Sequence, residues 1–144
     1  MKKTLFISMV LLFTTPLFSQ ITATKRIPPV LIGKVQGMDC QKYDSTFVIT
    51  YSDLKYTQLT ELKSFSLNEK DFNDLYSVIE RGFNEVPSDE IIIETPNDIL
   101  YLKYTKVIGV VNLQITHFVN KNPEIIGLIK YLTKNAAIKL FGRK

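Results

Sequence analysis

Apolar and polar residues alternate over several stretches of this chain, which is the pattern of β-strands that bury one face. The clearest early example spans residues 45–52, where Phe47, Ile49 and Tyr51 are separated by a valine and a threonine. β-branched and aromatic residues of this kind favour a strand. The alternation is weaker over residues 55–67, for which we predict a second strand, with a helical turn inside it as the alternative.

A helical period replaces this alternation in the middle of the chain. Apolar side chains recur there at three- and four-residue spacing, which places them on one stripe of a helix. The stripe consists of Phe72, Leu75, Tyr76, Ile79 and Phe83. We predict a helix over residues 69–83 with one buried face. Asn68 is a suitable N-cap, Ser66 offers an alternative as part of a capping box, and Pro87 follows the end of the pattern.

Three further stretches, residues 90–95, 99–105 and 110–119, have strand composition and are joined by short turns. They predict an antiparallel meander with one dry face and one polar face. The dry face of the last strand carries Val111, Leu113, Ile115 and His117. The polar face is the candidate binding surface, because tyrosine provides contact area at low entropic cost. Its residues are Tyr101, Lys103, Asn112, Gln114, Thr116 and Lys130.

The two ends of the mature chain give weaker signals. Residues 125–132 favour a strand over a helix, because Gly127 is a poor helix residue and the rest are strand formers, but the helix stays open. Thr133 is then the N-cap of a short terminal helix, and Gly142 ends it. Near the N-terminus, residues 31–39 (LIGKVQGMD) predict a loop or a short edge strand.

These elements together predict an α+β fold. We expect one antiparallel sheet of five or six strands, the 69–83 helix on one of its faces, and a short C-terminal helix. Residues 21–144 form a single small domain, since no repeat or linker divides them.

The first residues have the pattern of a cleaved secretory signal peptide. Lys2 and Lys3 precede an apolar run over residues 5–18, which is too short to span a bilayer but suits a signal sequence. We predict removal of residues 1–20, with cleavage after Ser19 or after Ala23. An uncleaved anchor is the alternative. No transmembrane anchor is expected once the signal is removed, and the protein is expected to be periplasmic or secreted.

Charge is distributed unevenly along the chain. The formal net charge is +4, and Lys2 and Lys3 supply two of those charges. Acidic residues predominate over residues 61–98, whereas Glu124 is the only acid in residues 99–144. A basic C-terminal third can attract an anionic partner. We do not expect nucleic acid to be that partner, because arginine is scarce among these bases and an exported protein does not meet intracellular nucleic acid.

No residue pattern predicts a catalytic centre, a metal site or a cofactor. The chain has one cysteine and one histidine, Cys40 and His117, and nothing in their spacing supports a thiol–imidazole pair. His117 falls on the dry face of its strand and is expected to be structural. Cys40 is expected to be a loop thiol or a small packed residue, and is a candidate for an intermolecular disulfide because an exported chain with an odd cysteine has no internal partner for it.

The sequence therefore favours an exported, non-enzymatic protein that binds another protein or an envelope component through the polar sheet face. Two alternatives remain. One is a small envelope hydrolase with a dispersed acid/base site. The other is a domain that associates electrostatically with anionic lipid or polysaccharide through its basic C-terminal third.

Overall fold

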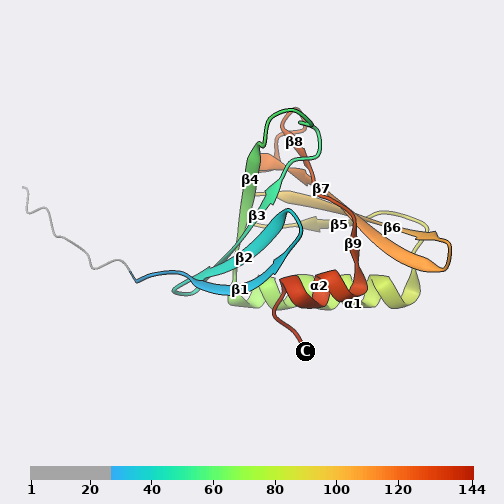
Figure 1. Ribbon diagram of the computed structural model, residues 1–144, viewed down its shortest axis with the longest axis horizontal. Coiled ribbons are helices and arrows are strands. Elements are labelled where there is room, and N and C mark those ends of the chain that lie inside the picture. The colour runs from blue at the N-terminus through green and yellow to red at the C-terminus, as the bar shows by residue number, and fades with distance from the viewer. Residues whose placement is uncertain (1–26) are drawn as a thin grey trace, which may run out of the picture.

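The computed structural model describes residues 27–144, which form two antiparallel sheets and two α-helices (Figure 1). Sheet A contains, in order, β1 (Val30–Val35), β2 (Met38–Tyr43), β3 (Thr46–Ser52) and β4 (Leu62–Asn68). Sheet B contains β5 (Ile91–Glu94), β6 (Ile99–Val107), β7 (Val110–Phe118) and β8 (Ile126–Leu128), with β9 (Leu132–Thr133) also paired to β7. The helices are α1 (Glu69–Glu85) and α2 (Lys134–Leu140), and Val119–Lys121 forms the short 3₁₀ turn η1. The predicted signal peptide, residues 1–20, lies outside the described residues.

The α+β class, the antiparallel pairing, the main helix and the short C-terminal helix are all confirmed. The strands form two sheets, where the sequence predicts one sheet of five or six strands. Part of the difference lies near the N-terminus, where residues 30–43 fold into the β1–β2 hairpin, whereas the sequence predicted a loop or a short edge strand over residues 31–39. Gly37 occupies the turn with φ 78°, a conformation that glycine adopts without strain. Short alternating runs on either side of such a turn resemble a loop in sequence.

Helix α1 has the predicted buried stripe, and Asn68 is its N-cap. The Asn68 side chain accepts a hydrogen bond from the Asp71 N–H at 2.8 Å, and the helix ends at Val86, which has a left-handed φ of 46°. The stripe residues Phe72, Leu75, Ile79 and Phe83 are buried, whereas Tyr76 is half-buried. No helix within residues 27–144 combines the length and the apolar character needed to cross a bilayer.

The two helices fill the space at one end of both sheets (Figure 1). Helix α1 contacts strands of sheet A and of sheet B, and α2 contacts β1, β2 and β7. The ring of Phe72 in α1 stacks on that of Phe141, which directly follows α2, with 4.9 Å between the ring centroids. Gly33 in β1 allows α2 to approach, since a Cβ at that position would lie 2.1 Å from the Lys139 carbonyl oxygen. The apolar faces of both sheets and both helices therefore share one core.

Away from the helices, the loop after β3 bonds directly to β8. The Leu54 N–H donates to the Leu128 carbonyl oxygen at 3.0 Å, and the Leu128 N–H donates to Asp53 Oδ1 at 3.0 Å. The two sheets are thus joined by polar contacts at one end and by apolar packing with helices at the other.

The strand interpretation of residues 125–132 is confirmed in β8 and β9, with an interruption between them. Thr133 is the N-cap of α2 as predicted, because its Oγ1 accepts from the Ala136 N–H at 3.3 Å. Gly142 follows the helix with φ 63°.

Candidate functional site

Strand register places most of the predicted binding residues side by side on the outer face of sheet B, the face directed away from the core. Tyr101 pairs with Thr116, and Lys103 pairs with Gln114. Asn112 is next along β7 and pairs with Thr105 of β6. Neighbouring positions of opposite parity are buried, so the predicted alternation of a dry and a polar face is confirmed for these two strands. The buried positions are Leu100, Leu102, Tyr104, Leu113, Ile115 and His117.

Lys130, the remaining predicted residue, lies outside the regular strands beside this face. Strand β8 pairs Leu128 with Thr116, whereas β9 pairs Leu132 with Leu113, so three residues on one side span the two residues Gln114 and Ile115 on the other. This one-residue shift is a β-bulge, which turns side chains out of the regular alternation. The bulge leaves both Lys130 and Tyr131 exposed. Tyr131 was not among the residues predicted for this surface.

Tyr131 borders a shallow groove at the polar end of the outer face. The groove has a volume of about 370 Å³ and is also lined by Thr105, Val107 and Asn112. The exposed fraction of Tyr131 is 54%. An aromatic ring beside hydroxyl and amide groups gives this end of the face both apolar area and hydrogen-bonding groups.

The other end of the outer face is apolar, which the sequence analysis missed. The rings of Tyr101 and Phe118 lie 4.7 Å apart. Ile99 pairs with Phe118, and Ile92 pairs with Tyr101 and is 60% exposed. The sequence did place Ile99 on the same face as Tyr101, because the two are separated by one residue in a strand. The positions of Phe118 and Ile92 on this face depend on strand pairing, which the sequence does not show.

An ion pair lies at the edge of the apolar end of the face, where Glu94 pairs with Ile99. Lys121 Nζ lies 2.6 Å from Glu94 Oε1. This hydrogen bond from the Lys121 ammonium, together with its charge, lowers the pKa of Glu94 below the ordinary value. Both side chains are accessible to water, and such pairs contribute little to stability. Lys103, at the polar end, is exposed.

His117 lies on the opposite side of sheet B and is buried there, as its position on the dry face predicted. Its Nδ1 is 2.7 Å from Tyr51 Oη, and Asp98 Oδ1 lies 3.0 Å from its Nε2, although the alignment there is not that of a hydrogen bond. Tyr51 and His117 are 0% exposed and Asp98 is 5% exposed. Burial raises the pKa of Tyr51, and the nearby Asp53 and Asp98 carboxylates raise it further. The three groups resemble a proton relay in composition, but none of them is accessible to a substrate in this conformation.

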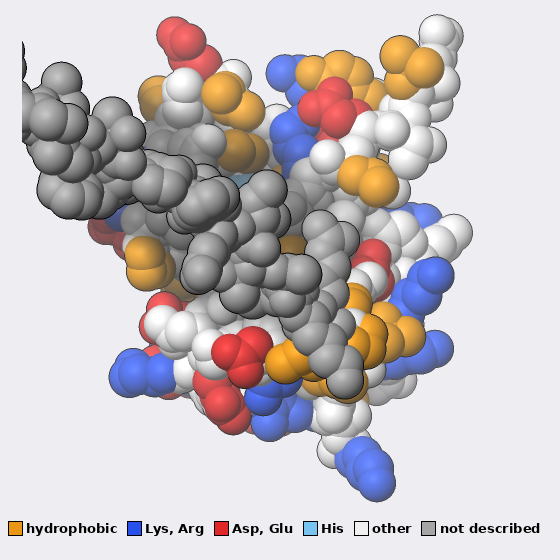
Figure 2. Space-filling view, turned by 90° about the vertical axis from the view of Figure 1, so that its left-hand side faces the viewer, with side chains coloured by type: hydrophobic (Ala, Val, Ile, Leu, Met, Phe, Trp, Pro, Cys, Tyr) orange, Lys and Arg blue, Asp and Glu red, His pale blue; other side chains and the backbone are white. Residues whose placement is uncertain are grey.

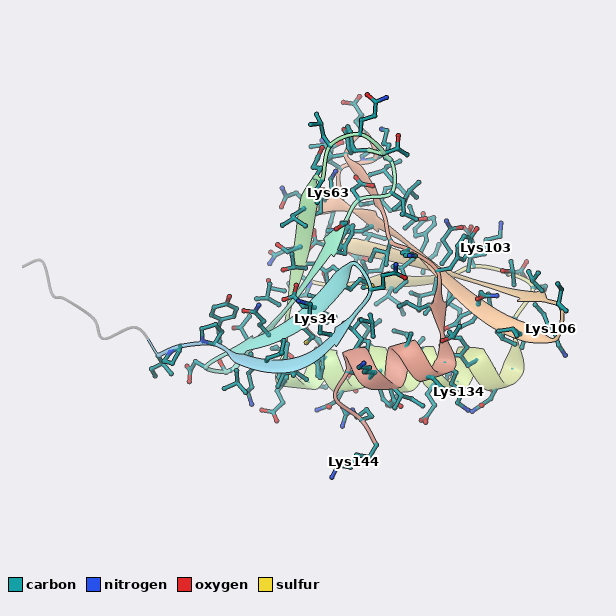
Figure 3. All side chains as sticks on the ribbon, viewed as in Figure 1. Lys34, Lys63, Lys103, Lys106, Lys134 and Lys144 are labelled. Atoms are coloured by element: carbon teal, nitrogen blue, oxygen red, sulfur yellow. The ribbon has the colours of Figure 1, made fainter. Side chains whose placement is uncertain are left out.

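A second buried polar group, Asp53, lies two residues after Tyr51 in the chain. The carboxylate of Asp53 accepts from Lys63 Nζ at 2.5 Å and from the Lys55 and Leu128 N–H groups at 3.0 Å each (Lys63 is labelled in Figure 3). Burial alone disfavours the charged form, but these donors hold the pKa of Asp53 below its ordinary value. The role of Asp53 in joining the loop to β8 depends on the tertiary structure, so the sequence did not predict it.

The expectation of an intermolecular disulfide through Cys40 does not agree with the structure. Cys40 lies in β2 and is 0% exposed, so another chain cannot reach its sulfur while the protein is folded. Burial, followed by the charge of Asp39, raises the pKa of the thiol to about 12, which suppresses the reactive thiolate. The alternative of a small packed residue is confirmed. Within the described residues no hydrogen bond joins Cys40 to His117.

In the part of the chain that the structure describes, no three side chains of histidine, cysteine, aspartate or glutamate are grouped as metal ligands would be. No family model, curated protein or solved structure matches the chain. Its function is therefore inferred from its own geometry.

Proposed function

We propose that this chain is an exported, non-enzymatic binding protein, which engages another protein or an envelope component through the outer face of sheet B. The observation that carries the proposal is the arrangement of that face. An aromatic and aliphatic cluster at one end, centred on Tyr101 and Phe118, adjoins polar and basic residues and the Tyr131 groove at the other.

This arrangement has the composition of a protein-binding surface. Interfaces commonly have an apolar centre enriched in aromatic residues and a polar rim that stays accessible to water. Truncation of a tyrosine at such a centre often costs more binding free energy than truncation of its neighbours. Tyr101 and Tyr131 are the anchors that we assign to the two ends of the face, with Lys103, Asn112 and Gln114 as polar contacts between them.

The shape of the face favours a macromolecular partner over a small substrate. Small-molecule sites are concave and enclose most of their ligand. The groove beside Tyr131 is shallow, and its other lining residues, Thr105, Val107 and Asn112, come from the paired strands β6 and β7. An extended contact along the pleated surface uses both the groove and the apolar cluster, whereas a small ligand uses only one of them.

A photocrosslinking experiment tests the proposal. A photoreactive phenylalanine analogue is introduced at position 131 or at position 43, in the chain expressed at its native level in its own host. Tyr43 is the matched control because it is 46% exposed on sheet A. On that side of the molecule, basic, acidic and hydrophobic side chains are interspersed (Figure 2). We expect one discrete adduct from position 131 and none from position 43.

A second set of variants identifies the face itself. Tyr101→Ala and Lys103→Glu, each combined with the analogue at position 131, should reduce the adduct at least about tenfold. Ser64→Ala on sheet A should leave it unchanged. Equal crosslinking from positions 43 and 131, or an adduct at 131 that Tyr101→Ala and Lys103→Glu leave intact, would contradict the proposed face.

Export is a separate part of the proposal and has its own test. The apolar run of residues 5–18 after Lys2 and Lys3 supports it. N-terminal sequencing of the protein isolated from its host should give a chain that begins at residue 20 or residue 24, recovered from the periplasm or the medium. An intact N-terminal methionine on cytosolic material would contradict export without affecting the proposed face.

A further inference from the structure

The tip of the β6–β7 hairpin has an unusual residue in a conformation that disfavours it. Val107 pairs with Val110, so Ile108 and Gly109 form a two-residue loop with φ angles of 50° and 79°. Two-residue loops with positive φ at both positions usually contain asparagine, aspartate or glycine. Isoleucine is β-branched, and its side chain clashes with the backbone in the left-handed region. The sequence therefore places isoleucine where it opposes folding.

Nothing in the described core compensates for this strain. The exposed fraction is 99% for Ile108, 55% for Val107 and 51% for Val110. The two other two-residue hairpin loops follow the usual preference, because Gly37 and Asp44 occupy their positive-φ positions. A strained, exposed residue that does not stabilise the fold is typical of a site that contacts another molecule.

We define the apolar tip as residues 107–110. Two lysines of β6 lie next to it. Lys106 precedes the tip, and Lys103 lies three residues farther back along β6 (Figure 3). Because successive side chains of a strand point to opposite faces, the two lysines flank the hairpin on its two faces. Both are exposed, and residues 99–123 contain no aspartate or glutamate.

We propose that the hairpin tip docks on an anionic lipid bilayer. Val107, Ile108 and Val110 enter the boundary between the headgroups and the acyl chains, and Lys103 and Lys106 contact anionic headgroups. The pairing of a small apolar tip with cations on both faces matches a bilayer, in which negative charge is spread laterally above an apolar layer. A protein groove that received the tip would need acidic residues on both of its walls. The contact is small, so the docking is reversible.

This surface meets the one assigned to a partner at Lys103 and at Val107, which also lines the Tyr131 groove, but the two apolar clusters are distinct. The tip lies at the end of the hairpin, whereas the Tyr101–Phe118 cluster lies at the opposite end of the same strands. Docking through the tip leaves that cluster accessible. Ile108 belongs only to the tip and Tyr101 only to the partner face, so variants at these two positions distinguish failure of one proposal from failure of the other.

Vesicle sedimentation with purified full-length protein tests the docking. The chain should bind vesicles that contain anionic phosphatidylglycerol more strongly than vesicles of phosphatidylcholine alone, and salt should weaken the binding. Ile108→Asn should lower the partition coefficient at least about tenfold, since it removes the apolar contact. The same change relieves the backbone strain, so the variant folds at least as well as the parent. Ile125→Asn is the control, because Ile125 is 45% exposed and lies outside the tip.

The lysines are tested by Lys103→Gln combined with Lys106→Gln. Each lysine near an anionic surface contributes about 1 kcal/mol, which corresponds to roughly fivefold per residue. The double variant should lose binding to anionic vesicles and keep the weak binding to neutral ones. All variants share the same first 26 residues, so a difference between them cannot come from that segment.

A fluorescent probe reports whether the tip itself enters the bilayer. The chain has no tryptophan, so Val110→Trp introduces a single tryptophan whose emission can be excited selectively. Anionic vesicles should shift its emission to shorter wavelength, whereas Tyr43→Trp on sheet A should show no shift. An Ile108→Asn variant that is folded and binds as well as the parent would overturn the proposal, as would a Val110→Trp spectrum that anionic vesicles leave unchanged.

Discussion

Tyr51 of sheet A and His117 of sheet B are 66 positions apart in the chain, yet Tyr51 Oη lies 2.7 Å from His117 Nδ1. Both side chains are fully buried, and Gly127 of β8 lies against the phenol. The contact joins the two sheets at the end that the helices do not fill. Buried polar groups that satisfy each other in this way specify one relative placement of the elements they connect.

Tyr51→Phe should lower the free energy of unfolding by about 1–3 kcal/mol, because it leaves the buried His117 Nδ1 without a hydrogen-bond partner. Urea unfolding at neutral pH measures the change. Tyr43→Phe removes an exposed hydroxyl and should change stability by less than about 0.5 kcal/mol. A Tyr51→Phe protein as stable as the parent would show that this hydrogen bond contributes nothing to the joint.

Gly127→Ala should destabilise the protein through the same contact. A Cβ at position 127 would lie 1.9 Å from Tyr51 Oη and 2.9 Å from Tyr51 Cζ, so the ring or strand β8 must move. We expect a loss of about 2 kcal/mol or more, as in other overpacked cores. The double variant Tyr51→Phe/Gly127→Ala should lose less stability than the sum of the two single variants, since removing the Tyr51 hydroxyl relieves part of the clash. Strict additivity in this double-mutant cycle would contradict the assigned contact.

Asp53 should make stability depend on pH in the acidic range. Its folded pKa is lowered below the ordinary 3.8, so its contribution is complete above the ordinary value and is lost as the pH falls from there through the lower folded pKa. Asp53→Asn should cost about 2–3 kcal/mol at pH 7, because it leaves Lys63 with only the more exposed Glu61 as a counter-ion. The variant should also lose part of the decline in stability below about pH 4.

The matched control for that measurement is Asp44→Asn. Asp44 is exposed and has a left-handed φ of 54°, which asparagine adopts equally well. Its stability and pH profile should match those of the parent. If Asp53→Asn and the parent had the same pH profile, the ion pair with Lys63 would not be the cause of the acidic transition.

Cys40 should be inert while the protein is folded. Burial raises the pKa of its thiol to about 12, and reagents cannot reach the sulfur. Modification by a thiol reagent at pH 8 should therefore follow the unfolding rate and become fast only in denaturant. The protein should also migrate as a monomer in non-reducing electrophoresis. Rapid labelling of the native chain, or a reducible dimer, would show that β2 opens or that Cys40 is accessible.

Local patterns were sufficient for most individual elements. The stripe from Phe72 to Phe83 predicted α1, Thr133 predicted the start of α2, and the parity of β7 placed His117 in the core. Each of these signals depends on the period of a single helix or strand, which is a property of the backbone and is therefore written along the sequence.

The candidate surface was predicted only in part, for a corresponding reason. Tyr101, Lys103 and Gln114 could be assigned to one face from parity within two adjacent strands. Phe118 and Ile92 join that face through register with their neighbours, and Tyr131 joins it through a bulge that depends on two strands pairing with β7 at shifted registers. Register is fixed by side-chain packing across strands, so it cannot be obtained from one strand alone.

By itself, then, the sequence determined most of the helices and strands and which side of each is apolar, since burial favours an uninterrupted apolar face. Tertiary structure alone decided that the strands divide into two sheets, that Tyr51 meets His117, that Asp53 meets Lys63 and β8, and that Cys40 is enclosed. These contacts join segments far apart in the chain. They form because the apolar faces must be buried together and the polar groups buried with them must find partners, which no local period encodes.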